Sequence, residues 1–309
     1  MKIVVTGGAG YIGSVLVSDL LNSGHNVTVI DNLMYNQTSL AHLVRNRNLD
    51  FVFKDIRNIS EIRNYYSQAD LIIPLAAIVG APACLKDPVL ASTTNKDAVA
   101  EMMKILSKEQ RVIMPTTNSA YGNSSGKYCD ETSQLIPLSL YAKDKVAIEE
   151  IVLQHAQSTS LRLATVFGIS PRMRLDLLVN NFVSRALKDK FIVVFEGSYK
   201  RNYIHILDVV QAFKLAIDSP EKFNGQIFNV GLSTANLSKI ELCEQILEQI
   251  PDFVFFESEV GQDPDKRNYL VSNVKIEAAG FKPQVSLEQG ISELIKGLPI
   301  FGQHLFSNV

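Results

Sequence analysis

Two patterns of hydrophobic and polar positions alternate in the first half of the chain. Short apolar runs rich in valine, isoleucine and leucine predict buried parallel strands, because both faces of such strands are covered. These runs occupy residues 3–5, 27–30, 51–53, 71–73, 112–114 and 161–164. Apolar residues at helical spacing predict helices between them, near residues 11–23, 38–47, 59–67, 88–107 and 140–157. This alternation predicts an α/β fold, a doubly wound parallel sheet with helices on both faces.

A glycine-rich turn stands between the first predicted strand and the first predicted helix. Gly7, Gly10 and Gly13 follow one another at three-residue intervals, and Asp31 ends the second strand. Glycine suits such a turn because a pyrophosphate can approach bare backbone at the positive end of the following helix. A glycine turn between strand and helix, followed by an acidic residue at the end of the next strand, predicts a dinucleotide site in a Rossmann-type sheet.

The residue at the end of the second strand indicates which dinucleotide binds. The Asp31 carboxylate can accept hydrogen bonds from ribose hydroxyls and would repel a 2′-phosphate, and no arginine follows at 32–34. We therefore expect NAD as the cofactor. The expected cofactor-binding residues are Gly7, Gly10, Tyr11, Ile12, Gly13, Asp31, Asn32, Asp55, Ile56, Ala76 and Ala77, joined by Tyr141 and Lys145.

The second half of the chain has a looser pattern. Residues 169–174 hold a proline and two arginines and predict a loop. Further elements are expected as helices at 175–188, 207–217, 238–249 and 286–296 and as strands at 191–195 and 226–230. Right-handed crossovers favour the strand order 3-2-1-4-5-6. We predict an NAD-binding domain at 1–166 with a return segment at about 203–230, and a smaller α/β substrate-binding lobe at 167–309.

A tyrosine and a lysine supply the candidate catalytic pair. Tyr141 and Lys145 are four residues apart and so share one face of a predicted helix. A free phenol, with a pKa near ~10, is a poor base at neutral pH, and a neighbouring ammonium favours the phenolate. At the end of the fifth strand, Thr117 or Ser119 could donate a hydrogen bond to the reacting oxygen.

Composition argues against several classes of protein, namely those that bind nucleic acid, span a membrane or hold a metal ion. The 309 residues are 46% hydrophobic with a net charge of −2, which gives no electrostatic case for nucleic acid or an anionic membrane. No apolar run approaches the ~20 residues of a membrane span. Three widely separated cysteines and five scattered histidines predict reduced thiols and no metal site. We expect a cytoplasmic protein.

Taken together, these motifs resemble those of one known family. Residues 6–13 are similar to its Thr-Gly-x-x-Gly-x-x-Gly loop, and Tyr141 and Lys145 match its Tyr-x-x-x-Lys. Its further signatures are matched by residues 161–168, 201–208 and 228–231. The chain resembles the extended short-chain dehydrogenase/reductases, the group of NAD-dependent nucleotide-sugar epimerases and dehydratases. Residues 165–174 are similar to a bacterial subgroup linked to surface-polysaccharide sugars, including GDP-heptose enzymes.

The resemblance implies a chemical role for each motif. Tyr141 removes a proton from a sugar hydroxyl, usually at carbon 4, while NAD takes the hydride from the same carbon. Thr117 orients the oxygen, and Lys145 lowers the pKa of the phenol and holds the nicotinamide ribose. The implied substrate-binding residues are Thr117, Asn118, Ser119, Asn180, Arg201 and Arg267. The family also implies a homodimer formed by the helices near 88–107 and 140–157.

Departures from the family pattern limit the reaction. Nucleotide-sugar 4,6-dehydratases carry Asp-Glu after the catalytic threonine, where this chain has Asn118 and Ser119. Water elimination is therefore disfavoured, and a 4-dehydrogenase and a 4-epimerase both stay open. A 4,6-dehydratase or a keto-sugar reductase is the alternative enzyme. A more distant alternative is a non-catalytic dinucleotide sensor, although such proteins typically lose the tyrosine or the lysine.

Overall fold

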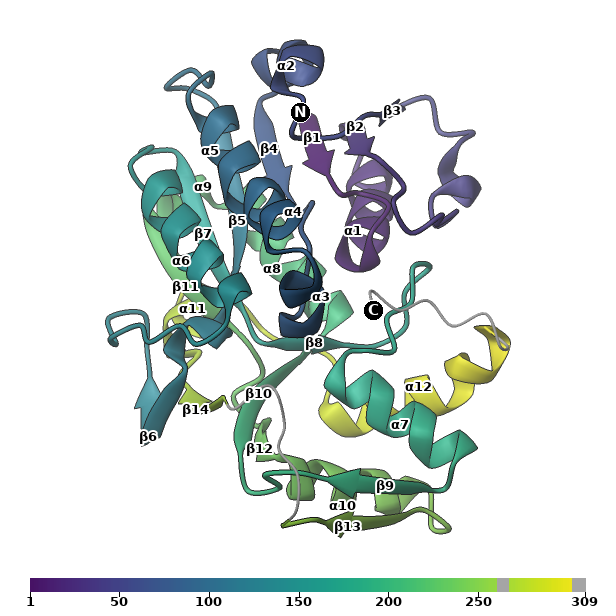
Figure 1. Ribbon diagram of the computed structural model, residues 1–309. Helices are drawn as coiled ribbons and strands as arrows, with labels where there is room; N and C mark the ends of the chain where they lie inside the picture. Colours follow the sequence, from purple (N-terminus) through teal and green to yellow (C-terminus); the bar gives the residue numbers. More distant parts are fainter. Residues whose placement is uncertain (260–266, 302–309) are drawn as a thin grey trace.

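A seven-stranded parallel sheet forms the centre of the computed structural model, which describes residues 1–259 and 267–301 (Figure 1). The strands stand in the order β3-β2-β1-β4-β5-β7-β11. They are β1 (Lys2–Thr6), β2 (Asn26–Asp31), β3 (Leu49–Phe53), β4 (Leu71–Pro74), β5 (Arg111–Thr117), β7 (Ser158–Leu163) and β11 (Gln226–Val230). The first six follow the predicted order, and the predicted return strand adds a seventh beside β7.

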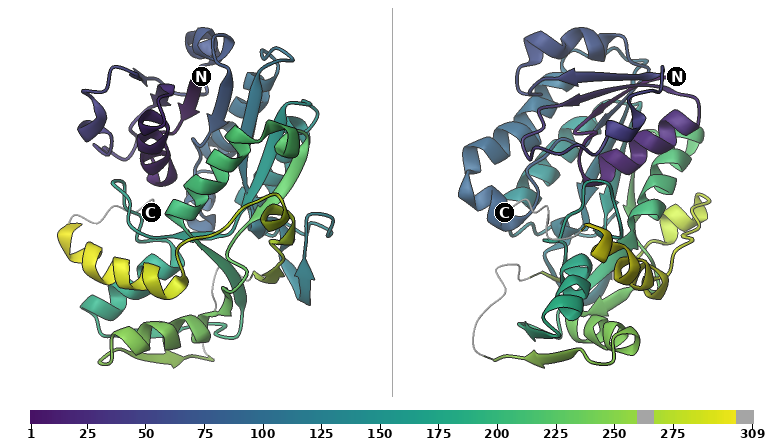
Figure 2. Two further views of the ribbon diagram at one scale, coloured as in Figure 1. Left: turned by 180° about the vertical axis from the view of Figure 1, so that it is seen from behind. Right: turned by 90° about the vertical axis from the view of Figure 1, so that its right-hand side faces the viewer.

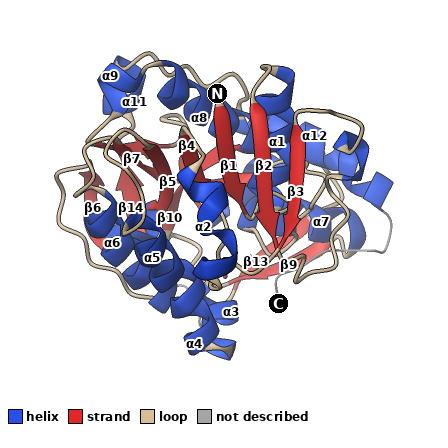
Figure 3. Cartoon of the chain, turned by 90° about the horizontal axis from the view of Figure 1, so that it is seen from above, coloured by secondary structure: helices blue, strands red, loops and turns tan. Residues whose placement is uncertain are grey.

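Side chains that alternate along the strands feed two hydrophobic cores, one on each face. Ile3 and Val5 belong to one core, whereas Val4 belongs to the other. The first face is covered by α1 (Tyr11–Asn22) and α8 (Ile206–Asp218). The second is covered by α2 (Ile59–Ser67), α5 (Ala98–Met103) and α6 (Leu140–Val152). Viewed from above, β1, β2 and β3 lie side by side between these layers (Figure 3).

Much of the later part of the chain gathers below the sheet (Figure 2). Its helices are α7 (Leu178–Lys188), α10 (Lys239–Gln249) and α12 (Leu287–Gly297). Two small sheets accompany them, formed by β8 (Thr165–Phe167), β10 (Lys200–His205) and β12 (Asn236–Ser238), and by β9 (Phe191–Val194) and β13 (Val254–Glu257). A further parallel pair joins β6 (Asn123–Cys129) to β14 (Asn268–Val271). The domain boundary at 166/167 stays a prediction.

Short helices complete the described chain. They connect the larger elements or extend their ends. They are α3 (Ala81–Lys86), α4 (Pro88–Ser92), α9 (Pro220–Phe223) and α11 (Val274–Ala278), the 3-10 turns η1 (Ala41–Leu43), η3 (Asn118–Tyr121) and η4 (Leu298–Phe301), and the π turn η2 (Thr93–Asp97).

The predicted helix at 38–47 is wrong, since only the short turn η1 forms there. Polar side chains of this segment are instead bound to the glycine turn and its neighbour. The Ser39 hydroxyl donates to the carbonyl of Ala9, and the Gln37 amide donates to the Asp31 carboxylate. Side-chain hydrogen bonds to Ala9 and Asp31 therefore stand in place of the helical bonds that the apolar spacing predicted.

The predicted helix at 88–107 ends early, at Met103, and is interrupted by η2. The π turn places the buried Asn95 beside Ile78, whose backbone N–H donates to the side-chain oxygen Oδ1 of Asn95 at 2.7 Å. The Asn95 amide donates back to the Ile78 carbonyl at 2.9 Å. Such turns often occur beside functional sites, and Ile78 lines the cavity described below.

Candidate active site

A cavity of about 490 Å³ opens at the carboxyl ends of the central strands. Ligands gather at this edge of open parallel sheets, because the strand order reverses between β1 and β4. Most of the predicted site residues line it. They are Gly7, Gly10, Tyr11, Ile12, Gly13, Asp31, Asn32, Asp55, Ile56, Ala76, Ala77, Thr117, Ser119, Tyr141, Lys145, Arg201 and Arg267.

The glycine turn is packed too closely for side chains. At Gly7, where φ is +68°, an added Cβ would lie 2.5 Å from the backbone N of Ala76. At Gly13 it would lie 2.4 Å from the Gly7 carbonyl oxygen. Gly10 stands immediately before α1 and has no side chain to cover the first turn of that helix. The arrangement leaves a helix N-terminus at the cavity wall, which suits a pyrophosphate.

Asp31 is held firmly at the end of β2. Its carboxylate accepts from the backbone N–H of Leu33 at 2.8 Å and of Ala9 at 3.0 Å. Burial raises the pKa of Asp31, and these two N–H donors oppose that shift. A fixed carboxylate at this point fits the ribose hydroxyls of NAD.

Asp55, which lines the cavity, forms an ion pair with Arg57 in which Nη2 and Oδ2 are 2.7 Å apart. The Arg57 guanidinium holds the pKa of Asp55 below its usual range.

The candidate catalytic pair, Tyr141 and Lys145, stands on the first turns of α6. Ser139 caps this helix by accepting from the Ala142 N–H. The Lys145 ammonium nitrogen lies 6.0 Å from the centre of the Tyr141 ring and donates to the Pro115 carbonyl at 3.0 Å. The predicted spacing therefore does bring the two side chains to one wall of the cavity.

Burial dominates the protonation of both groups. It raises the pKa of Tyr141 to about 12, while the charges of Arg174 and Arg267 oppose the shift. It lowers the pKa of Lys145 to about 8, against the opposing effect of Asp144. We expected Lys145 to lower the pKa of the phenol, but the net shift is upward, because desolvation of the phenolate outweighs the nearby positive charges.

The end of β5 supplies hydroxyl groups. The Thr117 hydroxyl donates to the Ser119 hydroxyl at 2.8 Å and accepts from the Ser119 N–H at 3.1 Å. The Arg267 guanidinium also donates to the Ser119 hydroxyl. Both predicted hydroxyls therefore line the cavity, and they are linked to Arg267, one of the predicted substrate-binding residues.

Three cationic side chains from the later part of the chain line the cavity. Arg201, from β10, stacks over the ring of Tyr269, with 5.8 Å between the guanidinium carbon and the ring centre. Lys239, missed from the sequence, begins α10 and donates to the Phe195 carbonyl at 2.7 Å. With Arg267 they suit a diphosphate, because arginine and lysine donate several hydrogen bonds to phosphate oxygens.

The loop at 168–177 contributes two further arginines to the cavity wall. Arg174 forms an ion pair with Asp176, and Arg172 lies over the ring of Tyr35, 5.0 Å from its centre. The sequence signalled this loop by its two arginines and its proline, but gave no sign that it reaches the cavity. Their position was missed because it depends on contacts with residues far away in the chain.

Two predicted substrate residues lie outside the cavity wall. Asn180 is fully buried, where its amide accepts from Gly168 N–H and donates to the Arg174 carbonyl and the Tyr11 hydroxyl. The structure therefore gives Asn180 a supporting position behind the wall rather than an open one. Asn118 is also fully buried and forms no side-chain hydrogen bond with the described residues.

The three cysteines, Cys84, Cys129 and Cys243, are buried and free. Within residues 1–259 and 267–301, no three histidine, cysteine or acidic side chains are grouped so that they could hold a metal ion. None of the helices in this described part is long and apolar enough to cross a membrane.

Comparison with known proteins identifies relatives of the whole chain. The model of a family described as "NAD dependent epimerase/dehydratase family" matches residues 3–231. The low-salt glycan biosynthesis protein Agl12 of Haloferax volcanii is 28% identical, with 96% of this chain and 97% of that protein aligned. UDP-N-acetyl-alpha-D-glucosaminuronate decarboxylase of Bacillus cytotoxicus is 26% identical at the same coverage. UDP-glucuronic acid 4-epimerase from Bacillus cereus, solved with UDP-glucuronic acid and NAD, superposes with a TM-score of 0.85 at 25% identity, covering 97% of this chain and 100% of that one.

The family match extends from the first strand to the return strand, so it includes the glycine turn, Asp31 and the Tyr141–Lys145 pair. The residues present fit the family's cofactor. An open helix N-terminus can receive the pyrophosphate, and a carboxylate at the end of β2 can receive the ribose hydroxyls. The chain therefore belongs to the NAD dependent epimerase/dehydratase family, and NAD is its cofactor.

Proposed function

We propose that the chain oxidises the carbon-4 hydroxyl of a nucleotide-activated hexose or heptose, as a 4-dehydrogenase or a 4-epimerase. The observation that carries this proposal is the presence of Thr117, Tyr141 and Lys145 in the lining of a single cavity. The glycine turn and Asp31 line the same cavity, and so do three cations that suit a diphosphate. Cofactor, reacting sugar and diphosphate can thus be bound together.

The proposed chemistry assigns one role to each side chain. When bound, NAD supplies the hydride acceptor and a positively charged ring. Tyr141 accepts the proton of the carbon-4 hydroxyl, Thr117 donates a hydrogen bond to that oxygen, and Lys145 stabilises the phenolate and holds the ribose. Because the pKa of Tyr141 is raised to about 12, the phenolate needs the positive charges of Lys145 and of the bound cofactor ring to form near neutral pH.

The proposed nucleotide end of the substrate lies against Arg201, Lys239 and Arg267. Among nucleotide sugars we favour a heptose or hexose of bacterial surface polysaccharides, including GDP-heptose. The support is the similarity of residues 165–174 to that subgroup. Asn118 and Ser119 argue against a 4,6-dehydratase, since neither side chain carries the carboxyl group that water elimination requires.

A second candidate is a nucleotide-activated uronic acid. Arg174 lines the cavity, and its charge acts on Tyr141, so a sugar carboxylate beside the reacting carbon would meet a guanidinium. Several relatives are named as decarboxylases of such acids, and one structural neighbour is named as a 4-epimerase of UDP-glucuronic acid. Oxidation at carbon 4 is the shared first step, because a 4-keto group next to carbon 5 promotes loss of the carboxylate.

Purified protein incubated with single nucleotide sugars tests the proposal. GDP-heptose, UDP-glucose and UDP-glucuronic acid are compared, and products are followed by mass spectrometry and by the absorbance of reduced cofactor. An isomer of unchanged mass indicates an epimerase, a product lighter by two hydrogens with reduced cofactor indicates a dehydrogenase, and loss of carbon dioxide indicates a decarboxylase. Binding of NAD without turnover of any of these sugars would instead favour the non-catalytic sensor.

The homodimer stays a prediction. Apolar side chains on the two helices expected at the interface are already used inside the subunit, where Val99, Met102, Ile148 and Val152 are buried in the second core. Nearby, Leu85 and Val89 are exposed on α3 and α4. Sedimentation of the purified chain will give its oligomeric state.

A further inference from the structure

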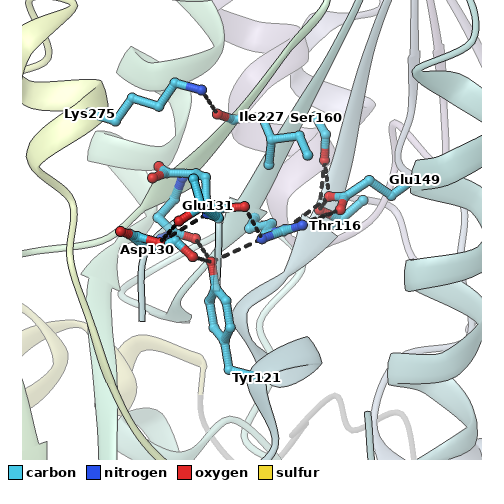
Figure 4. Close-up of polar contacts among 11 residues, drawn as sticks. Thr116, Tyr121, Asp130, Glu131, Glu149, Ser160, Ile227 and Lys275 are labelled. Carbon is cyan, nitrogen blue, oxygen red and sulfur yellow. Dashed lines mark hydrogen bonds and ion pairs between the residues drawn. The ribbon is translucent and has the colours of Figure 1, made fainter. Parts of the chain in front are cut away.

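The buried carboxylate of Glu149 joins three elements, α6, β5 and β7 (Figure 4). Glu149, on α6, accepts hydrogen bonds from the Thr116 hydroxyl of β5 at 2.9 Å and from the Ser160 hydroxyl of β7 at 2.5 Å. Figure 4 shows both hydroxyls directed at this carboxylate. The proposed chemistry uses none of these three side chains.

Arg162 neutralises this carboxylate. Its Nη2 lies 2.5 Å from Glu149 Oε1, and its Nε lies 3.1 Å from both carboxylate oxygens. The remaining Nη1 donates to the Tyr121 hydroxyl at 3.0 Å. Both charged side chains are buried, so each requires the other, because an unpaired charge in such a place is strongly destabilising.

Helix geometry relates Glu149 to the catalytic pair. Tyr141, Lys145 and Glu149 follow at four-residue intervals on α6, so they lie along one face of the helix. That face rests against β5 and β7. The Glu149 contacts therefore fix the rotation of α6 about its axis, two turns beyond Tyr141.

Three consecutive residues at the end of β5 complete the connection. The Pro115 carbonyl accepts from the Lys145 ammonium, the Thr116 hydroxyl donates to Glu149, and Thr117 lines the cavity. Thr116 is thus next in sequence to Pro115, which binds Lys145, and to Thr117. Movement of α6 against β5 would change the position of Lys145 relative to Pro115 and that of Tyr141 relative to Thr117 together.

We propose that Glu149, paired with Arg162, is a positioning residue that sets Tyr141 and Lys145 against Thr117. It acts through Thr116 and does not touch the reacting atoms. The expected loss of kcat rests on the proposed function, because it needs a nucleotide sugar that the enzyme converts. The expected displacement of Tyr141 and Lys145 relative to Thr117 does not rest on it. A misplacement of about 1 Å at a catalytic site can cost on the order of 100-fold in rate, so the effect should be measurable.

The test compares variants that alter the hydrogen bond between the Thr116 hydroxyl and the Glu149 carboxylate in steps. Thr116→Val removes the hydroxyl while leaving the Glu149–Arg162 charges paired, and Thr116→Ser keeps the hydroxyl. Glu149→Gln removes the charge itself. Arg111→Met is the matched control, because Arg111 begins the same strand and donates to the carbonyls of Ala216 and Ile217 at its opposite end.

We expect Thr116→Val to lower kcat by about tenfold or more with KM for the nucleotide sugar changed by less than about threefold. Thr116→Ser should restore most of kcat. Arg111→Met should lose thermal stability and keep kcat. An unchanged kcat in Thr116→Val would overturn the proposal, as would an equal loss of kcat in Arg111→Met.

A crystal structure of the Thr116→Val variant with NAD gives a readout that needs no sugar. We expect Tyr141 and Lys145 to be displaced relative to Thr117, with the contact between Lys145 and the Pro115 carbonyl lengthened or lost. Unchanged positions would refute the positioning role. If the wild-type protein turns over no nucleotide sugar, the proposed function fails, while this structural comparison still decides the role of Glu149. Should Glu149→Gln fail to fold, Thr116→Val alone decides the matter.

Discussion

Replacing the catalytic lysine by methionine should make the cofactor-free protein more stable near neutral pH while abolishing turnover. Burial lowers the pKa of Lys145 from 10.5 to about 8. The folded protein therefore holds this proton less tightly than the unfolded chain. Below about pH 8 folding places a positive charge in a buried position, and stability is lost in proportion to the shift in pKa.

The size of the effect follows from that shift. A difference of about 2.5 pKa units corresponds to about 3 kcal/mol of destabilisation, fully present below about pH 8. Between about pH 8 and pH 10.5 the unfolded chain binds more protons than the folded one, so the stability of the wild type rises with pH. Lys145→Met also loses the bond to the Pro115 carbonyl, at a cost of about 1 kcal/mol. The variant should therefore gain about 2 kcal/mol at about pH 7 and lose this advantage by about pH 10.

Urea unfolding of both proteins without NAD, at a series of pH values, measures this difference. Lys143→Met is the matched control, because Lys143 is exposed on the same helix. It should change stability by less than about 0.5 kcal/mol at every pH. The reasoning is refuted if Lys145→Met is no more stable than the wild type near neutral pH, or if its advantage does not change with pH.

Three further substitutions test the site, and Gly24→Ala serves as the control for one of them. Tyr141→Phe should lower kcat on the order of 10²- to 10⁴-fold with NAD binding retained, as measured by turnover and cofactor titration; a near-normal rate would contradict its role as the base. Gly13→Ala should weaken NAD binding by about tenfold or more by calorimetric titration, since its Cβ would lie 2.4 Å from the Gly7 carbonyl oxygen. Gly24→Ala, with φ of +81° and no atom within 4 Å of the added Cβ, should lose only stability. Arg267→Met should raise KM for the nucleotide sugar about tenfold with a smaller change in kcat, and the opposite split would remove Arg267 from phosphate binding.

Local signals predicted most of the central sheet. A strand that is buried on both faces, such as β1, is a short run of β-branched residues whichever strands lie beside it. The glycine turn before α1 can be recognised because its tight backbone conformation requires glycine within a few residues. The Tyr141–Lys145 pair was likewise predicted because both residues stand on one helix. These features depend on residues close together in the sequence.

Features that depend on distant partners were missed. The pair of strands β6 and β14 joins segments more than a hundred residues apart, and neither segment has a strong alternating pattern. Lys239 and Arg174 reach the cavity only because the later part of the chain folds against the sheet. The false helix at 38–47 arose similarly, since the bond of Ser39 to the Ala9 carbonyl and that of Gln37 to the Asp31 carboxylate could not be known from spacing alone.

The central claim is that oxidation occurs at carbon 4 of the sugar, beside Tyr141. A nucleotide sugar that the enzyme converts, labelled with deuterium at carbon 4, tests it when the reaction is stopped within the first turnover and the cofactor is examined by mass spectrometry. We predict reduced cofactor that carries one deuterium in the wild type and none in Tyr141→Phe. Formation of product from the labelled sugar with no deuterium ever reaching the cofactor would contradict the account.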